Sequence, residues 1–290
     1  MPKIFIYDSF IQLNNLSPLE SKLMQTHKYL MENADESRRL DMKTDDDVTA
    51  RQAHWAGIAP GMRVVDIGCG PGKTTSRLSE LVQPGGSAVG VDLSEQRMEF
   101  AREHYGNSRT TFARCDLLKP LTELGQFDFA WVRFLLEYHR TNCFELVKNI
   151  SDILKPGGIL CLIDLDYNCL SHFGHSPRME RAVAAIMKSI EEKENFDPYV
   201  GRKLYSFLYD LGYQEIDVKV EAHHQIFGEL KRTDEFNWTK KVEVAAKQSG
   251  YGFDEYEGGF EQFLEEFRTF FADPRRFTYT PMISCSGRKP

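Results

Sequence analysis

The residues best placed to do chemistry lie in the segment 64–72, with the sequence VVDIGCGPG. Its apolar start predicts a buried strand, which runs straight into a turn that contains Gly68, Gly70 and Gly72. Glycine reaches positive φ without a steric penalty and lets a ligand approach the backbone closely. Asp66 stands just before the first glycine, where it would repel a phosphate and would suit a ligand that carries an amino group. The segment therefore predicts a small-molecule binding site at the end of a strand.

Spacing excludes two phosphate-binding motifs that share features with this turn. A P-loop requires the pattern G-x-x-x-x-G-K-[ST]. Lys73 and Thr74 fit its end, but Ile67 stands where its first glycine is needed. The dinucleotide fingerprint is G-x-G-x-x-G, whereas the glycines here follow the spacing G-x-G-x-G. The turn is therefore predicted to bind neither a phosphate nor a pyrophosphate.

Two more acidic residues each follow an apolar segment that is predicted to be a strand. Asp92 ends the first segment and precedes Leu93. An acid in this position can accept hydrogen bonds from both hydroxyls of a ribose, as in other doubly wound nucleoside binders. Asp116 ends the second segment and precedes Leu117. Because predicted strands alternate with helices from about residue 63 to 221, the pattern indicates an α/β fold with a parallel, doubly wound sheet.

In order and spacing, these signals resemble the class I methyltransferases that use S-adenosylmethionine (SAM), above all the ubiquinone/menaquinone-type and bacterial small-molecule methyltransferases. The segments that carry the resemblance are 64–72, 88–94, 110–117, 127–134 and 153–160. The resemblance covers roughly residues 36–225. It implies a Rossmann-like, seven-stranded sheet with helical cap insertions, and SAM as the cofactor.

The resemblance also implies roles for individual residues. Asp116 would meet the adenine amino group, and the backbone at Val132 and Arg133 would pass around the methionine part of SAM. The Arg133 side chain could equally be a structural ion-pair partner. Arg39, which precedes the glycine turn, could hold the SAM carboxylate or remain a solvated charge. The predicted cofactor-binding residues are Asp66, Gly68, Gly70, Gly72, Asp92, Leu93, Asp116, Leu117, Val132, Arg133 and Arg39.

Methyl transfer from a sulfonium is an in-line displacement that needs little covalent help. Holding the nucleophile and the methyl group about 3 Å apart can lower the barrier by roughly 7–11 kcal/mol. His139, just after the fourth predicted strand, is the candidate general base, because histidine is poised near neutral pH; a capping or packing role is the alternative. Further candidates are His172, His175, Asp164 and Asp166. The two histidines of this set lack acidic or cysteine partners at ligand spacing, so no metal site is predicted.

Composition and charge argue against several other classes. The chain has 290 residues, of which 41% are hydrophobic, as in ordinary globular proteins. Its formal net charge of −7 and pI near 5.7 argue against a nucleic-acid partner, which would require a basic surface. The six cysteines are scattered, so neither a disulfide framework nor a zinc site is expected. No signal peptide or membrane-spanning stretch is recognisable, which predicts a cytoplasmic protein.

Four regions are expected: an N-terminal helical cap (1–60), the SAM-binding core (61–227, with a cap insertion at about 168–198), an aromatic-rich helical cap insertion (228–275) and the final strand (276–290). Aromatic residues at 260, 263, 267, 270 and 271 fit one face of a helix. They are expected either to pack the third region onto the core or to line a substrate pocket. Trp238 and Phe236, outside this face, are the candidate pocket rings.

The predicted function is methyl transfer from SAM to a small-molecule acceptor, at an oxygen, nitrogen or carbon atom. No [DNS]-P-P-[YFW] tetrapeptide, expected for amino methylation of DNA bases, follows the fourth predicted strand. Two alternatives stay open: a methyltransferase that acts on proteins or peptides, and an inactive protein of this fold that senses SAM. The sequence specifies neither the acceptor nor the oligomeric state.

Overall fold

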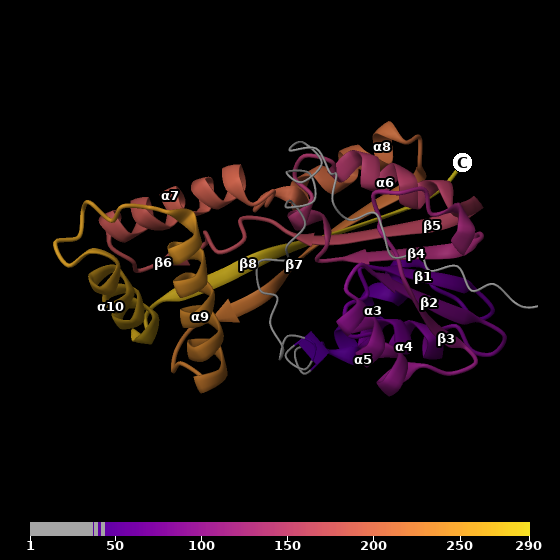
Figure 1. Cartoon of the computed structure of the whole chain (residues 1–290), viewed down its shortest axis with the longest axis horizontal. Coiled ribbons are helices and arrows are strands. Elements are labelled where there is room, and N and C mark those ends of the chain that lie inside the picture. The colour runs from indigo at the N-terminus through magenta and orange to yellow at the C-terminus, as the bar shows by residue number, and fades with distance from the viewer. Residues whose placement is uncertain (1–36, 38–39, 42–43) are drawn as a thin grey trace, which may run out of the picture. The chain divides into compact units, whose positions relative to one another are not determined.

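A computed structural model describes residues 37, 40–41 and 44–290. Arg39 and most of the N-terminal helical cap expected at 1–60 lie outside the described residues. The central feature is a sheet of eight strands within the described part of the chain (Figure 1). The strands are β1 (Arg63–Ile67), β2 (Ser87–Asp92), β3 (Thr110–Arg114), β4 (Phe127–Arg133), β5 (Leu154–Leu165), β6 (His172–Phe173), β7 (Gln214–Ile226) and β8 (Phe277–Arg288).

The strand order is β3-β2-β1-β4-β5-β8-β6, and β7 also pairs with β8. Strands β1 to β5 pair in parallel, whereas β8 runs antiparallel to both β5 and β7. This is the predicted doubly wound α/β sheet. Its last strand is antiparallel, and the two-residue β6 adds to the seven expected strands. The chain order reverses between β1 and β4, so the loops that follow these strands diverge. Ligands of open α/β sheets bind at such a switch point.

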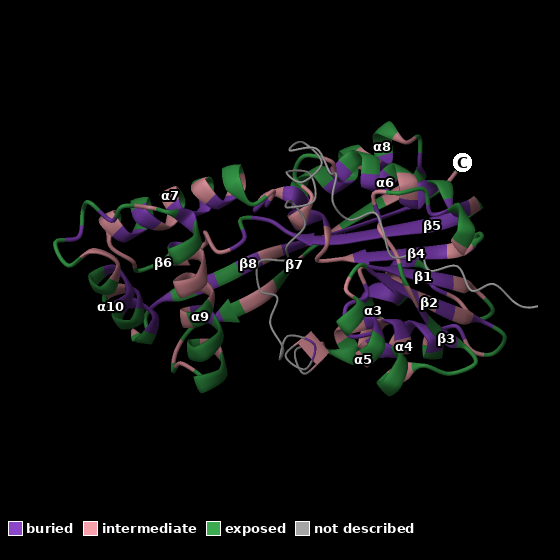
Figure 2. Ribbon diagram, viewed as in Figure 1, coloured by how far each residue is buried: buried purple, intermediate pink, exposed green. Residues whose placement is uncertain are grey.

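Helices cover both faces of the sheet, as a parallel sheet requires. The helices are α3 (Asp46–Ala56), α4 (Lys73–Leu81), α5 (Glu95–Tyr105), α6 (Cys143–Asp152), α7 (Pro177–Lys193), α8 (Leu204–Asp210), α9 (Arg232–Ser249) and α10 (Gly259–Ala272), with short 3₁₀ helices η1 (Thr122–Leu124), η2 (Leu136–Tyr138) and η3 (Val200–Lys203). One hydrophobic cluster joins α6 and α8 to the sheet, and another joins α3 and α4 to it. The central strands β4 and β5 are consequently buried along most of their length (Figure 2).

A separate hydrophobic cluster, which we call the cap cluster, is built from α7, α9 and α10 and the outer part of β7. The aromatic face of α10 packs inside it, through Phe263, Phe267, Phe270 and Phe271. The rings therefore pack mainly against other parts of the cap cluster, so the prediction that this face packs the region 228–275 onto the core is not confirmed. Trp238 is 4% exposed and belongs to the same cluster. Phe236 is 70% exposed, so its expected place in an enclosing pocket wall is wrong.

Candidate functional site

The glycine turn begins where β1 ends, at the switch point of the sheet. Gly68, Gly70 and Gly72 have φ values of 71°, 55° and 92°, which favour glycine over residues with a side chain. The backbone N–H groups of Gly68 and Cys69 both donate to the carbonyl of Val91 in β2, at 2.8 and 3.0 Å. These bonds hold the start of the turn against the neighbouring strand.

Two of the glycines serve different purposes. A Cβ atom at Gly72 would lie 2.8 Å from the ring of Phe112 and from the Cβ of Ala101. This glycine therefore permits close packing of the turn against α5 and β3. A Cβ atom at Gly70 would meet nothing closer than Leu40 Cδ1 at 3.9 Å. The backbone at Gly70 thus leaves room for a ligand.

The carboxylate of Asp92 is fixed beside the turn. Its Oδ2 accepts the backbone N–H of Gly70 at 3.1 Å, and its Oδ1 accepts that of Ser94 at 2.9 Å. Arg97 Nε lies 3.5 Å from Oδ1. Ser94 also caps α5, because its hydroxyl accepts the N–H of Arg97. A carboxylate has about four acceptor positions, so Asp92 can still accept bonds from ligand hydroxyls.

Asp66 is buried at the end of β1, where its Oδ2 accepts the hydroxyl proton of Thr75 at 2.6 Å. Burial, together with the nearby Asp92, raises the pKa of Asp66 to about 7, although the hydrogen bond from Thr75 and the charge of Arg133 oppose the shift. A cation bound nearby would favour the ionised form of Asp66. The site therefore suits a positively charged ligand.

Arg133 ends β4, and no ion pair within 4.0 Å joins it to a carboxylate of the described residues. Burial lowers its pKa to about 10, and Asp66, Asp164 and Asp45 partly offset this effect. Its Nε is buried and has no hydrogen-bond partner among the described residues. Val132 is fully buried, so only its backbone can face a ligand.

The remaining predicted cofactor residues follow β2 and β3. Leu93 is exposed, and its carbonyl accepts a bond from Arg114 Nε at 3.0 Å. Asp116 is partly exposed, and its Oδ1 accepts the N–H of Leu118 at 3.1 Å. Leu117 is buried in the core cluster beneath. Asp116 is thus accessible to a ligand, whereas the side chain of Leu117 is not.

The segment before α3 is tied to the glycine turn. Lys73 Nζ donates to the carbonyl oxygens of Asp41 and Thr44, at 3.4 and 2.9 Å. The hydroxyl of Tyr105 donates to the Asp41 carboxylate. The lysine that completes the apparent P-loop ending therefore binds backbone carbonyls in this structure.

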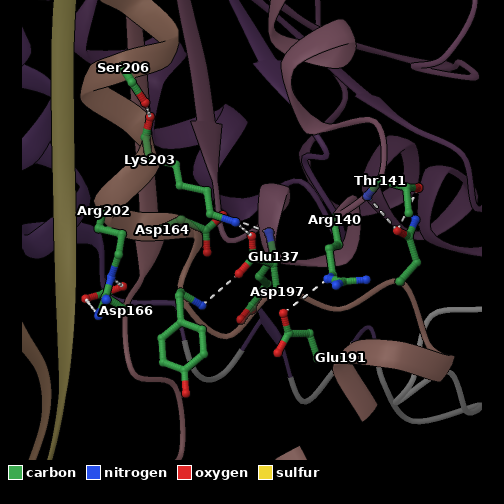
Figure 3. Close-up of polar contacts among 12 residues, drawn as sticks. Glu137, Arg140, Thr141, Asp164, Asp166, Glu191, Asp197, Arg202, Lys203 and Ser206 are labelled. Atoms are coloured by element: carbon green, nitrogen blue, oxygen red, sulfur yellow. Dashed lines mark hydrogen bonds and ion pairs between the residues drawn. The ribbon is translucent and has the colours of Figure 1, made fainter. Parts of the chain in front are cut away.

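Three of the candidate bases have structural partners. Asp164 Oδ2 accepts the backbone N–H of Leu136 at 2.9 Å, and burial raises its pKa well above the usual value. Asp166 forms two bonds of 2.9 Å with Arg202 (Figure 3). His172 bonds Thr278 Oγ1 at 2.9 Å, and burial lowers its pKa to about 4.

His139 directly follows η2, and its backbone N–H donates to the Leu136 carbonyl at 3.0 Å. Because Asp164 accepts the backbone N–H groups of η2, it positions the segment that leads to His139. The ring of His175 lies 5.8 Å from that of Phe270 in the cap. A catalytic role for His139 stays a prediction.

A series of polar contacts that was not predicted from the sequence links the core to α9. Glu137 is buried, and its Oε2 accepts Nδ2 of Asn168 at 2.7 Å. Asn168 Oδ1 in turn accepts Nζ of Lys241 at 3.3 Å. Glu137 could have been noticed between apolar neighbours. Its partner Asn168, however, lies 31 residues further along the chain, and Lys241 lies another 73 residues beyond Asn168.

Within the described residues, no group of three or more histidine, cysteine or acidic side chains has the arrangement of a metal site. No described helix combines the length and the apolar composition needed to cross a bilayer. All six cysteines are free thiols.

The segment that contains the glycine turn, Asp92 and Asp116 is also similar to known proteins. Residues 64–158 match a family model described as a methyltransferase domain. The demethylmenaquinone methyltransferase of Lactococcus lactis is 28% identical over 134 residues, which cover 45% of this chain and 53% of that protein. The juvenile hormone acid O-methyltransferase of Bombyx mori is 26% identical over 195 residues, which cover 62% of this chain and 66% of that protein. The chain thus spans about half to two thirds of the length of these relatives.

The fold is also similar to that of a solved enzyme complex. Phosphoethanolamine N-methyltransferase 2 of Haemonchus contortus, bound to phosphomonomethylethanolamine and S-adenosylhomocysteine, has a TM-score of 0.51 and 17% identity. The match covers 84% of this chain and 52% of that one. The matched segment, the sheet order and the glycine turn define a class I methyltransferase domain. This chain carries such a domain, and the cofactor of the class is S-adenosylmethionine.

Proposed function

We propose that this protein transfers a methyl group from SAM to a small-molecule acceptor. The observation that carries the proposal is the Asp92 carboxylate, held by the N–H of Gly70 at the switch point of the sheet. That arrangement places a hydroxyl acceptor beside an open stretch of backbone, as a bound nucleoside requires. SAM supplies the methyl group on a sulfonium, which makes it an electrophile.

Each predicted cofactor residue has a proposed role. Asp92 accepts the ribose hydroxyls, with Leu93 beside it, and Asp116 accepts the adenine amino group. The backbone of Gly68 and Gly70 lies along the methionine part. Gly72 and Leu117 support the turn and the adenine end by packing, and Arg39 stays a candidate outside the described residues.

The methionine end fits the charges of the site. The buried, unpartnered Nε of Arg133 suits the cofactor carboxylate, because a guanidinium and a carboxylate form charge-assisted bonds. Asp66 suits the cationic part of the same ligand. Val132 contributes backbone only. Positioning of the acceptor supplies most of the rate, with His139 as the candidate base for an acceptor that must lose a proton.

A small-molecule acceptor is favoured by the relatives and by the charge. The named acceptors of the two relatives, demethylmenaquinone and juvenile hormone acid, are small molecules. The formal net charge of −7 disfavours a nucleic acid. A peptide acceptor remains the alternative outcome of the test.

The test is transfer of isotope-labelled methyl from SAM. The full chain is incubated with a metabolite extract or with a protein extract, and the labelled product is identified by mass spectrometry. We expect label in a small molecule, and we expect Asp92→Asn to abolish it at low SAM concentration. Label in protein would contradict the small-molecule acceptor. SAM binding without any transfer would indicate a sensor.

A further inference from the structure

Charged and uncharged residues alternate along the middle of β7, where residues 217–222 have the sequence DVKVEA. The charged side chains lie on the side of α3. Trp55 Nε1 of this helix donates to Asp217 Oδ2 at 3.1 Å, and Arg51 Nε lies 4.0 Å from Glu221 Oε1. Because successive side chains of a strand point to opposite faces of the sheet, the uncharged residues of the segment lie on the face away from α3.

The pairing of β7 with β8 shows which residues share this uncharged face. The cross-strand pairs on it are Val218–Cys285, Val220–Ile283, Ala222–Pro281 and Gln225–Tyr279. At the inner end, Cys285 and Ile283 pack in the core cluster that includes α8. From there the face continues outward along β8 to Tyr279.

Three phenylalanine rings extend the face at its outer end. Phe277 lies two residues before Tyr279 in β8, and their ring centres are 5.7 Å apart. Phe277 also pairs in register with Phe173 of β6, and its ring stacks on that of Phe227 at 6.2 Å. We use the name outer sheet face for the residues Phe173, Val218, Val220, Phe227, Phe277 and Tyr279.

The outer sheet face is exposed although it is apolar. Phe173 is 72% exposed, Val220 65% and Phe227 64%, and the other three residues are 39–43% exposed. In contrast, Thr278 and Thr280, which alternate with the rings of β8, are buried on the opposite face. An antiparallel sheet usually presents its polar side chains to water. Because the polarity is inverted here, this face is suited to being covered by another apolar surface.

The charge and shape of the outer sheet face make it complementary to itself. None of its residues and their cross-strand partners is charged, and Gln225 is the polar member. The whole chain has a formal net charge of −7, so a charged contact between two copies would be repulsive, whereas an uncharged contact adds little repulsion. An anionic lipid surface would instead require basic residues on the face. Two apolar sheet faces can pack directly on each other, about 10 Å apart.

The size of the outer sheet face is sufficient for a reversible dimer. An aromatic side chain buries about 150–250 Å² when it is fully covered. At the exposed fractions given above, the four rings and two valines leave roughly 600 Å² of apolar surface accessible on one copy. A symmetric contact would therefore bury roughly 1,200 Å² in total, which is the lower end of the range for specific interfaces.

We propose that the outer sheet face is the interface of a symmetric dimer, in which the same face of a second copy covers it. In a two-fold contact each copy contributes the same patch. The exposed rings of Phe173 and Phe227 supply most of the area, and Val220 packs closer to the inner end. The interface is built from β6, β7 and β8 away from the glycine turn, so it does not depend on the proposed methyl transfer.

The first experiment is sedimentation equilibrium of the full chain between about 1 and 100 µM. We expect the mass to rise with concentration from the 33.4 kDa of a monomer to twice that value, as mass action requires. Because the contact is uncharged, its dissociation constant should change less than about twofold between low and high salt. A monomer throughout the range would overturn the proposal, and cosedimentation of this monomer with phosphatidylcholine vesicles would assign the face to lipid instead. Growth beyond a dimer would overturn the two-fold contact.

The second experiment locates the interface by substitution. We expect Phe173→Ser to raise the dissociation constant of the dimer at least tenfold. Phe236→Ser is the matched control, because Phe236 is a phenylalanine of similar exposure on α9, outside the outer sheet face. Urea unfolding checks that each variant is folded. If Phe173→Ser does not unfold cooperatively, Val220→Lys takes its place, with the same loss expected from a charge in the apolar contact. An unchanged dissociation constant in the folded variant, or an equal loss in the control, would overturn the assignment.

Discussion

Asp66 is the penultimate residue of β1 and Asp92 is the last residue of the neighbouring β2, yet their carboxylates have different surroundings. Asp92 accepts two backbone N–H groups, whereas Asp66 accepts only the hydroxyl of Thr75 and is more deeply buried. Hydrogen bonds to an ionised carboxylate stabilise it, and burial without enough of them destabilises it. Asp92 can thus accept bonds from a ligand, whereas the pKa of Asp66 is raised to about 7.

Asp92→Asn tests the ribose role. The amide has one carbonyl acceptor and no charge, so we expect SAM affinity to fall at least about tenfold, which corresponds to about 1.4 kcal/mol. Charge-assisted bonds of roughly 1.5–3 kcal/mol each supply that difference. The variant should also be less stable, because its NH₂ faces the N–H of Gly70 or Ser94. Glu103→Gln, an exposed change on α5, is the control for calorimetry; a similar loss in both variants would contradict a specific role.

Asp66→Asn tests the charge of the methionine end. In the native protein, SAM affinity should rise as the pH increases from 5.5 to 7.5, because Asp66 ionises near pH 7 and its anion attracts a cationic ligand. The variant should bind more weakly at pH 7.5 and should lose this slope. Calorimetry across the pH range is the measurement. An unchanged slope would show that another group titrates.

Although Asp66→Asn should weaken SAM binding, it should increase the stability of the fold. Folding raises the pKa of Asp66 from its usual value of 3.8 to about 7. Between these pH values the folded state therefore binds more protons than the unfolded state. The free energy of unfolding therefore falls as the pH rises from about 4 to 7. At pH 8 we expect Asp66→Asn to increase the free energy of unfolding by up to about 4 kcal/mol, because each pKa unit corresponds to about 1.36 kcal/mol. At pH 4 the two proteins should differ little, as urea titrations can check.

At the scale of elements, the glycine turn combines packing with binding. Gly72 packs against α5 and β3, while Gly70 faces open space. We expect Gly72→Ala to destabilise the fold by about 1–3 kcal/mol through overpacking, besides the strain at positive φ. Gly70→Ala should cost only the strain, roughly 1–2 kcal/mol, yet should weaken SAM binding more strongly. Paired urea titrations and calorimetry separate the two effects, and the reverse order would contradict this division.

In the cap, the buried Trp238 and the exposed Phe236 lie two residues apart and should differ in their contribution to stability. Trp238 lies inside the cluster, and its ring is 5.6 Å from that of Phe271. Trp238→Ala should lower the free energy of unfolding by about 3–5 kcal/mol, whereas Phe236→Ala should change it by less than about 0.5 kcal/mol. Urea unfolding monitored by circular dichroism checks both. Equal effects would show that the cluster does not extend to Trp238.

At the scale of the whole molecule, the parallel core was predictable because its signals are local. Strands β1, β2 and β4 are short and mainly apolar, and the glycine turn follows β1 directly. The final strand expected at 276–290 corresponds to β8. The alternating strands and helices were expected to end near residue 221, but β7 extends to Ile226 because it continues its pairing with β8 to Thr278.

What the sequence could not predict depends on pairs that are distant along the chain. Asn168 meets Lys241 across 73 residues, and Arg276 meets the Gly228 carbonyl across 48. Only the packing of the cap against β7 and β8 creates such neighbours. The sequence likewise does not reveal which face of α9 is buried in the cap cluster, and Trp238 was therefore expected to line a pocket.

The central claim is that Asp92 and the glycine turn hold SAM, and a crystal structure of the full chain with S-adenosylhomocysteine tests it most directly. We predict that both ribose hydroxyls bond the Asp92 carboxylate and that the homocysteine part lies along the backbone of Gly68 and Gly70, with its carboxylate near Arg133. A ligand bound elsewhere, or a ribose that makes no contact with Asp92, would contradict the account.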